Sequence, residues 1–257
     1  MNNKRLFEGG AIRAVAFDAY GTLFRFSDHE HRLMIAEMLV DQGLIVDLDA
    51  FTESFKKSFQ HVGPWAEHKR EDGSPDRGYM LDGPVPCWIS TWEIWRRQFA
   101  HTFEEYKLAG DATAAANQLH GVLSRSEPYP DVHDAIEAIA DSGRIDGLLS
   151  NADEDFLQSA ISQARLRFSA IQSSESLRAY KPNRAVFQAL CARLHCAPTE
   201  VIYVGDSPQA DVHGAQHAGL RTALVQRSKT IEYPPDIPKP DLEVTSLIEV
   251  AALLGTE

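Results

Sequence analysis

Four polar residues each follow a hydrophobic run of the sequence, and their side chains could act together in one reaction. Asp18 follows the run AVAF, Ser150 ends the run GLLS, and Asp206 closes the run VIYVG. Lys181 comes shortly after a further run, in the segment AYKPN. If these runs are parallel strands, their carboxyl ends lie at one edge of a sheet, which is where ligands bind in open α/β folds. We therefore expect the four side chains to converge at that edge.

These residue types suit the attack of a carboxylate on an anionic centre. The carboxylate of Asp18 can act as a covalent nucleophile. The ammonium group of Lys181 can neutralise the negative charge of the substrate, and the hydroxyl of Ser150 can donate a hydrogen bond to the same oxygens. Gly21 and Thr22 lie in a turn whose backbone N–H groups can face the anion. The pattern predicts a site for a small anionic substrate.

A pair of carboxylates in the segment GDSPQAD predicts a metal site beside the nucleophile. Asp206 and Asp211 offer the hard oxygen ligands that suit Mg²⁺, an ion that binds few carboxylates together with water and substrate oxygens. An acidic pair next to Asp18 repels an anionic substrate unless a cation is present. We therefore expect Mg²⁺ to be the cofactor.

The elements that must position these residues form an α/β pattern. Several of the apolar runs are continuous and end on polar residues, which is typical of strands buried on both faces of a parallel sheet. Helical patterns separate the runs from residue 129 onward, which predicts an α/β fold with a parallel sheet. The five expected strands are residues 12–19, 145–151, 168–174, 201–207 and 221–226.

The segment between the first two expected strands is different, because it shows helical periodicity and no clear strand run. We therefore predict a catalytic core of residues 1–26 and 128–257 and an inserted helical domain of residues 27–127. Trp88, Trp92 and Trp95 form a predicted stripe on one helix of the insert, either as packing inside it or as an apolar wall over the site. The four expected helices cover residues 28–43, 47–62, 87–103 and 110–126, and a Gly- and Pro-rich loop covers 63–86.

Composition limits the class of partner. The 257 residues carry a formal net charge of −12, which argues against duplex nucleic acid or an anionic membrane surface as the main partner. Three cysteines at irregular spacing do not form a disulfide framework. The start of the sequence has no apolar signal region, and no apolar run reaches the length of a membrane span, so we expect a cytoplasmic protein. Its oligomeric state, monomer or homodimer, is left open.

Taken together, the motifs resemble those of the haloacid dehalogenase (HAD) superfamily of hydrolases. DAYGTL begins at Asp18, LLSN contains Ser150, YKPN contains Lys181, and GDSPQAD runs from Gly205 to Asp211, in the order that the family shows. The resemblance covers residues 12–26 and 128–250, and the helical insert lies where the C1-type cap of this family lies. It implies an α/β fold with a Rossmann-like parallel sheet and an all-helical cap.

The resemblance also implies roles for individual residues. Asp18 would form an aspartyl ester, Thr22 would orient it, and Lys181 would stabilise it. In the Mg²⁺-dependent branch of the family, residue 20 contributes only its backbone carbonyl to the metal. The implied sets are Asp18, Tyr20, Thr22, Ser150 and Lys181 for catalysis, Gly21, Asn151 and Lys181 for substrate, and Asp18, the Tyr20 carbonyl, Asp206 and Asp211 for Mg²⁺.

The identity of residue 20, a tyrosine here, differs between two branches of the family. Phosphatases of the superfamily usually carry a second Asp at this place, which protonates the leaving group and then activates water. A tyrosine is a poor base at neutral pH, and losing general acid–base help lowers the rate by about 10²–10⁴-fold. The 2-haloacid dehalogenases carry DxYGT, as this chain does, and their halide leaving group needs no proton.

The rest of the sequence departs from the dehalogenase pattern. Dehalogenases have Ser and Asn where this chain has Gly205 and Asp206, and a Tyr where it has Phe187. Their Arg for the substrate carboxylate falls near SFKKSF, where this chain has only lysines, which cannot form the same two-pronged contact. We therefore favour a Mg²⁺-dependent phosphatase acting on a small phosphorylated metabolite through an aspartyl-phosphate on Asp18. The alternatives are a metal-independent 2-haloacid dehalogenase and a catalytically weak HAD-fold binding protein.

Overall fold

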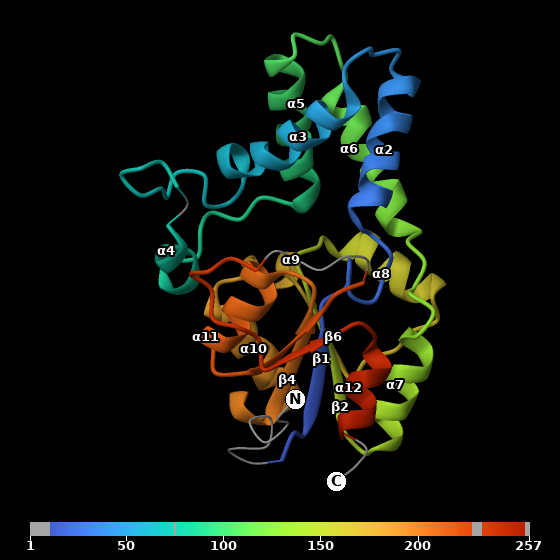
Figure 1. The fold of residues 1–257 in the computed structure, drawn as a ribbon, viewed down its shortest axis with the longest axis vertical. Helices are drawn as coiled ribbons and strands as arrows, with labels where there is room; N and C mark the ends of the chain where they lie inside the picture. The colour runs from blue at the N-terminus through green and yellow to red at the C-terminus, as the bar shows by residue number, and fades with distance from the viewer. Residues whose placement is uncertain (1–10, 75, 228–232, 255–257) are drawn as a thin grey trace.

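The computed structural model describes residues 11–74, 76–227 and 233–254, and its centre is a six-stranded parallel sheet. The strand order is β3-β2-β1-β4-β5-β6, so the first strand of the chain lies in the middle (Figure 1). This confirms the predicted α/β fold with its inserted helical cap. The strands are β1 (Ala14–Phe17), β2 (Ile145–Ser150), β3 (Ala170–Ser173), β4 (Val201–Gly205), β5 (Arg221–Val225) and β6 (Leu242–Val244).

Both faces of the sheet are covered, which explains the continuous apolar runs. Val15 and Phe17 of β1 belong to one buried cluster, together with side chains of α7 (Val132–Asp141), α8 (Glu154–Gln163) and α12 (Leu247–Leu254). Ala14 and Ala16 belong to a second cluster, with side chains of α10 (Arg184–Leu194) and α11 (Gly214–His217). Successive side chains of a strand point to opposite faces, so every residue of β1 is buried.

Two elements of the core differ from the prediction. The sixth strand was not predicted, because β6 has only three residues and lacks a long apolar run. The helical pattern between the fourth and fifth expected strands forms instead a π-helix (Pro208–His213) followed by the short α11. Wide turns of this kind are common at functional sites, and this one contains Asp211. The remaining short elements are α9 (Ser174–Leu177) and a 3₁₀ turn (Pro198–Glu200).

The cap contains four long helices above the carboxyl edge of the sheet (Figure 1). Each of the four begins at a residue whose side chain accepts a hydrogen bond from the first turn, which satisfies an otherwise unpaired N–H group. The loop expected over residues 63–86 also contains a short helix, α4 (Arg77–Asp82). The long helices, each with its capping residue, are α2 (Asp28–Asp41; Ser27), α3 (Leu48–Val62; Asp47), α5 (Thr91–Glu105; Ser90) and α6 (Ala112–Ser124; Asp111).

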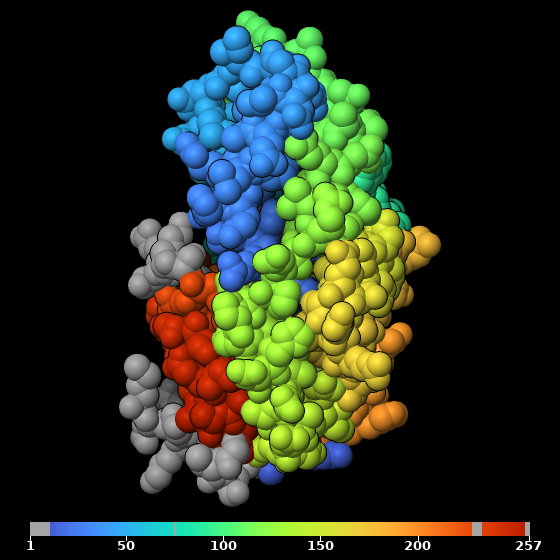
Figure 2. Space-filling view, turned by 90° about the vertical axis from the view of Figure 1, so that its right-hand side faces the viewer, coloured from blue at the N-terminus to red at the C-terminus, as the bar shows by residue number. Residues whose placement is uncertain are grey.

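The two chain segments that connect the cap to the core pair with each other. Arg25 N–H donates to the carbonyl of Glu127 over 2.8 Å, and Tyr129 N–H donates to the carbonyl of Leu23 over 2.9 Å. An isolated antiparallel bridge joins Phe24 to Pro128. This pairing lies at the predicted domain boundaries, whose placement stays a prediction. Figure 2 shows the cap, in blue and green, stacked on the core along the long axis of the molecule.

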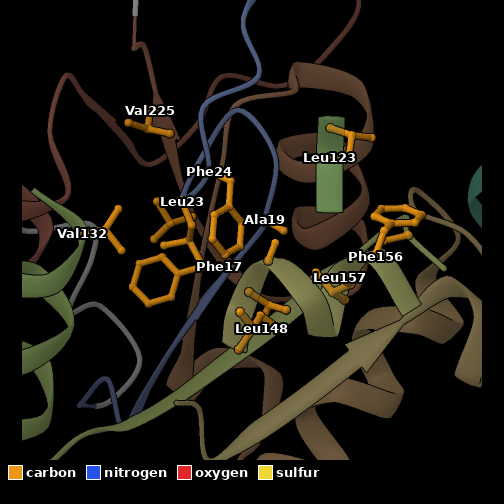
Figure 3. Close-up of a cluster of buried hydrophobic side chains, with 14 of the residues drawn as sticks. Phe17, Ala19, Leu23, Phe24, Leu123, Val132, Leu148, Phe156, Leu157 and Val225 are labelled. Carbon is orange, nitrogen blue, oxygen red and sulfur yellow. The ribbon is translucent and has the colours of Figure 1, made fainter. Parts of the chain in front are cut away.

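A buried apolar cluster continues from the sheet into the cap (Figure 3). Leu123 of α6 and Phe156 of α8 belong to the same cluster as Phe24 and Leu148. The ring of Trp95 on α5 lies 5.3 Å from the ring of Phe156, measured between centroids. The cap is therefore packed onto the core over α8.

The predicted tryptophan stripe was wrong for Trp88. Helix α5 begins at Thr91, so Trp88 lies in the segment before it and packs in a separate cluster with Trp65 and Tyr180. Trp92 Nε1 donates to the side-chain oxygen of Asn117 over 2.9 Å, within the cap. These contacts support packing as the role of Trp92. Within the described ranges, no helix is long and apolar enough to cross a membrane.

Candidate active site

The carboxylate of Asp18 lies at the carboxyl end of β1, in the middle of the sheet edge. Its backbone N–H donates to the carbonyl of Val204 over 2.9 Å, which continues the pairing of β1 with β4. The residue is 8% exposed. Lys181 Nζ donates to Asp18 Oδ1 over 2.7 Å, so the predicted nucleophile and the predicted cation meet.

Lys181 is held by three oxygen atoms. Its Nζ also lies 2.6 Å from Asp211 Oδ1 and 3.1 Å from the hydroxyl of Tyr203, which itself donates to the carbonyl of Leu149 over 2.7 Å. Burial by itself lowers the pKa of Lys181, but the charges of Asp18 and Asp211 outweigh it and hold that pKa well above its usual value. Lys181 is therefore a buried cation. Sequence reasoning missed Tyr203, whose only signal is a tyrosine within the aliphatic strand VIYVG.

The side chain of Asn151 binds both the backbone N–H and the backbone carbonyl of Lys181. Its Oδ1 accepts from Lys181 N–H over 2.8 Å, and its Nδ2 donates to the carbonyl of Lys181 over 3.1 Å. This contact couples the end of β2 to the Lys181 loop. Ser150, the last residue of β2, is 3% exposed. The predicted roles of Asn151 and Ser150 in binding the substrate stay predictions.

Three carboxylates meet beside this lysine. Asp18, Asp206 and Asp211 each offer an oxygen within 4.8 Å of the others. Burial, followed by the charges of Asp211 and Asp18, raises the pKa of Asp206 well above its usual value. Burial also raises the pKa of Asp211, to about 6, although Lys181 opposes the shift. When all three are ionised, three negative charges lie around the positive charge of Lys181. This donor set fits a hard divalent cation such as Mg²⁺.

Two glycines let the backbone approach these carboxylates closely. Gly21 has φ +85°, and a Cβ atom added there would lie 2.4 Å from Asp206 Oδ2. A Cβ atom added at Gly205 would lie 2.3 Å from Asp211 Cγ. Thr22 Oγ1 lies 3.5 Å from Asp206 Oδ1, so its hydroxyl reaches the acidic pair. Its predicted role in orienting Asp18 stays a prediction.

The side chain of Tyr20 is directed toward the cap–core packing. Its hydroxyl donates to the carbonyls of Leu123, at 3.2 Å, and Phe156, at 3.4 Å. Its ring lies 5.7 Å from each of the rings of Phe24 and Phe156. Burial, followed by the nearby charge of Asp18, raises the pKa of Tyr20 above its usual value. Tyr20 is therefore a neutral phenol whose proton is engaged by backbone carbonyls.

Residues 63–74 and 76–90, which we call the strap, and the start of α5 are hydrogen-bonded to the core. Asp153, three residues after Ser150, accepts hydrogen bonds from the N–H groups of Thr91 and Trp92, over 2.7 and 2.9 Å. Asn183, two residues after Lys181, donates to the carbonyl of Gly83 in the strap over 3.1 Å. The core therefore binds the cap through residues that lie next to the predicted catalytic groups in sequence.

The chain is similar in sequence to proteins of two different activities. Residues 12–219 match the family described as haloacid dehalogenase-like hydrolase. A glyceraldehyde 3-phosphate phosphatase of Methanopyrus kandleri is 30% identical over 91% of this chain and 93% of its own length. An (S)-2-haloacid dehalogenase of Xanthobacter autotrophicus is 26% identical over 84% of this chain and 76% of its own length.

Comparison with solved structures shows the same fold. The L-2-haloacid dehalogenase of Xanthobacter autotrophicus superposes with a TM-score of 0.71 at 22% identity, over 95% of this chain and 98% of the other. The hydrolase YfnB of Bacillus subtilis, in a structure bound to magnesium, superposes with a TM-score of 0.71 at 19% identity, over 95% and 99%.

Proposed function

We propose, from the premise that this chain belongs to the haloacid dehalogenase-like hydrolase family, that it is a Mg²⁺-dependent phosphatase for a small phosphorylated metabolite. The observation that carries the proposal is the cluster of Asp18, Asp206 and Asp211, two of which contact the ammonium group of Lys181. When all three carboxylates are ionised, their excess of negative charge repels an anionic substrate. One bound divalent cation removes the excess, and the carboxylates supply its preferred ligands. Asp18, Asp206, Asp211 and the Tyr20 carbonyl would hold it.

The chain's own residues account for the transfer step. Lys181 engages Asp18 Oδ1, so we assign attack on the phosphorus to Oδ2 of the same carboxylate. The new O–P bond forms as the bond to the leaving oxygen breaks, which leaves an aspartyl-phosphate on Asp18. Water then attacks the phosphorus and breaks the bond to the Asp18 oxygen, which releases inorganic phosphate and restores the carboxylate. When bound, Mg²⁺ supplies charge neutralisation and orients the phosphoryl oxygens.

The position of Tyr20 defines the kind of phosphate that suits this site. Its hydroxyl donates to two backbone carbonyls, so we assign it no proton transfer to the leaving group. A substrate with a good leaving group, such as an acyl or aryl phosphate, needs that proton least. General acid help is worth about 10²–10⁴ in rate, so simple alkyl phosphates are expected to react more slowly by a comparable factor.

Relatives support both this activity and one alternative. The phosphatase relative aligns over nearly the whole chain, and YfnB binds magnesium on the same fold. The alternative is a metal-independent 2-haloacid dehalogenase, which is favoured by Tyr20 within DAYGT and by the dehalogenase relatives. The three buried carboxylates count against it. A catalytically weak binding protein is a third reading, and the engagement of Asp18 by Lys181 counts against that one.

The test is a pair of assays on one preparation. We expect release of nitrophenol from p-nitrophenyl phosphate with Mg²⁺ and none after chelation with EDTA. Asp18→Asn, which keeps the shape of the side chain, is expected to abolish the activity. Halide release from 2-chloropropionate in EDTA would establish the dehalogenase instead. Failure of both reactions, with no Mg²⁺ binding in calorimetry, would leave the binding protein.

A further inference from the structure

Arg227, two residues beyond the end of β5, reaches back to the turn that follows Asp18. Its Nη2 and Nε donate to the carbonyl oxygen of Thr22 over 2.6 and 3.1 Å. Only 8% of the Arg227 side chain is exposed. Two N–H groups of the guanidinium therefore donate to the same backbone carbonyl of this turn. No motif in the sequence predicted this contact.

The guanidinium is itself fixed from other directions. Its Nη1 donates to both carboxylate oxygens of Asp131, each over 2.8 Å. Asp131 also accepts from the hydroxyl of Ser246 over 3.0 Å and from Leu247 N–H over 2.7 Å, at the start of α12. The ring of Tyr129 lies 4.3 Å from the centre of the guanidinium. Charge-assisted contacts of this geometry are stronger than neutral hydrogen bonds.

The turn that Arg227 holds faces the acidic pair. Gly21 packs so closely on Asp206 that an added Cβ would clash, and Thr22 Oγ1 lies 3.5 Å from Asp206 Oδ1. Leu23 belongs to the same buried cluster as Val225 of β5 (Figure 3). The carbonyl of Thr22 is thus the point at which a rigid part of the core can set the distance between this turn and Asp206.

We propose that Arg227 is a positioning residue for the reaction, acting through the Thr22 carbonyl on the turn between Asp18 and Leu23. It keeps the N–H groups of the turn and the carboxylate of Asp206 in the arrangement that receives the phosphoryl group and its cation. A displacement of about 1 Å in such an arrangement lowers turnover by about 10²-fold. The kinetic test of this inference rests on the proposed function. A second test, by hydrogen exchange, does not depend on it.

The experiment compares Arg227→Met, Arg227→Lys and a matched control, Arg13→Met. Arg13 pairs with Glu200 over 3.2 Å, and its side chain is 52% exposed. For p-nitrophenyl phosphate we expect kcat to fall at least tenfold in R227M and the Mg²⁺ concentration for half-activation to rise severalfold. R13M should match the wild type. R227K should be intermediate, because one ammonium group cannot form the forked contact. Assays are run well below the melting temperature of each variant.

A role in stability alone predicts a different result. Wild-type kcat and half-activation in R227M, with only a lower melting temperature, would overturn the proposal. If R227M does not fold, R227K decides by the same two quantities, and wild-type values for both would overturn it.

Hydrogen exchange separates this proposal from the proposed function. The N–H groups of Leu23 and Phe24 donate to the carbonyl of Ala19 over 2.7 and 2.8 Å. If the wild type hydrolyses no phosphate, the proposed function fails. Faster exchange of these two amides in R227M than in R13M would still support the positioning role, and equal exchange would overturn it.

Discussion

The hydroxyl of Tyr20 donates a hydrogen bond to the carbonyl of Leu123, 3.2 Å away on the cap helix α6. The residue two places after the nucleophile therefore bridges the core and the cap. Because the same hydroxyl also donates to the carbonyl of Phe156, Tyr20 links α6 of the cap to α8 of the core.

Tyr20→Phe is therefore expected to leave kcat for p-nitrophenyl phosphate within about threefold of the wild type. Its effect should be on stability, with a loss of about 1–2 kcal/mol because the carbonyls of Leu123 and Phe156 lose a donor. Urea unfolding and steady-state kinetics of the same variant measure both. A fall in kcat of about 10²-fold or more would instead identify Tyr20 as the proton donor.

Asp206→Asn should weaken metal binding and activity together. We expect the Mg²⁺ concentration for half-activation to rise at least about tenfold. Because burial and the charges of Asp211 and Asp18 raise the pKa of Asp206, its ionised form destabilises the folded metal-free protein. With EDTA, D206N should therefore melt at a higher temperature than the wild type at pH 8, and the difference should shrink as the pH is lowered.

The control for this prediction is Asp134→Asn, which removes an exposed carboxylate from α7. It should change neither half-activation by Mg²⁺ nor the melting temperature in EDTA. Unaltered Mg²⁺ activation in D206N would remove Asp206 from the proposed metal site.

Asp153→Ala should weaken the contact between the cap and the core. The N–H groups of Thr91 and Trp92 lose the carboxylate that accepts their hydrogen bonds, a change that typically destabilises a helix start by about 0.5–2 kcal/mol. We expect trypsin to cut faster after Lys69 and Arg70, which lie in the strap. Ser27→Ala, which removes the capping side chain of α2 within the cap, should leave the rate of cleavage in the strap unchanged.

His31 should make the stability of the protein depend on pH. The residue is 8% exposed, and its ring packs beside the rings of Phe26 and Phe55. Burial, assisted by the charge of Lys56, lowers the pKa of His31 to about 4. The unfolded chain, with an ordinary pKa near 6.5, binds the proton more readily, so stability falls as the pH drops from about 6.5 toward 4.

Between pH 7 and pH 5 this histidine should account for about 2 kcal/mol of lost unfolding free energy. His31→Phe should remove that part of the loss, whereas the exposed His133→Phe should retain it. Urea unfolding at both pH values measures the difference. An equal loss in wild type and H31F would show that His31 titrates normally in the folded protein.

The sequence located the central part of the site because the fold makes it predictable. Asp18 and Asp206 follow parallel strands, and such strands end at one edge, so the strand pattern predicts that these two carboxylates meet. Lys181 lies further from the end of its strand, and the structure shows that it also reaches Asp18. The order of strands along the sheet was not predicted. The three residues of β6 were also too few to produce a pattern.

Residues that act on backbone atoms were not predictable in the same way. Arg227 contacts the carbonyl of Thr22 across 205 positions of sequence, and Tyr203 lies within a strand whose other side chains only pack. Neither has a spacing that distinguishes it from an ordinary surface arginine or core tyrosine. Trp88 was assigned to a helix that begins three residues later, because Ser90 caps α5.

The pairing of Arg25 with Glu127 makes the cap an insertion whose two ends meet. The chain therefore enters and leaves the cap domain at one place, where the two connecting segments are hydrogen-bonded to each other. A tight turn of a few residues could join these two segments in place of the cap. We therefore expect that the cap can be replaced by one of different shape while the strand pairing of the sheet stays unchanged. Such a replacement would change the substrate on which the core acts.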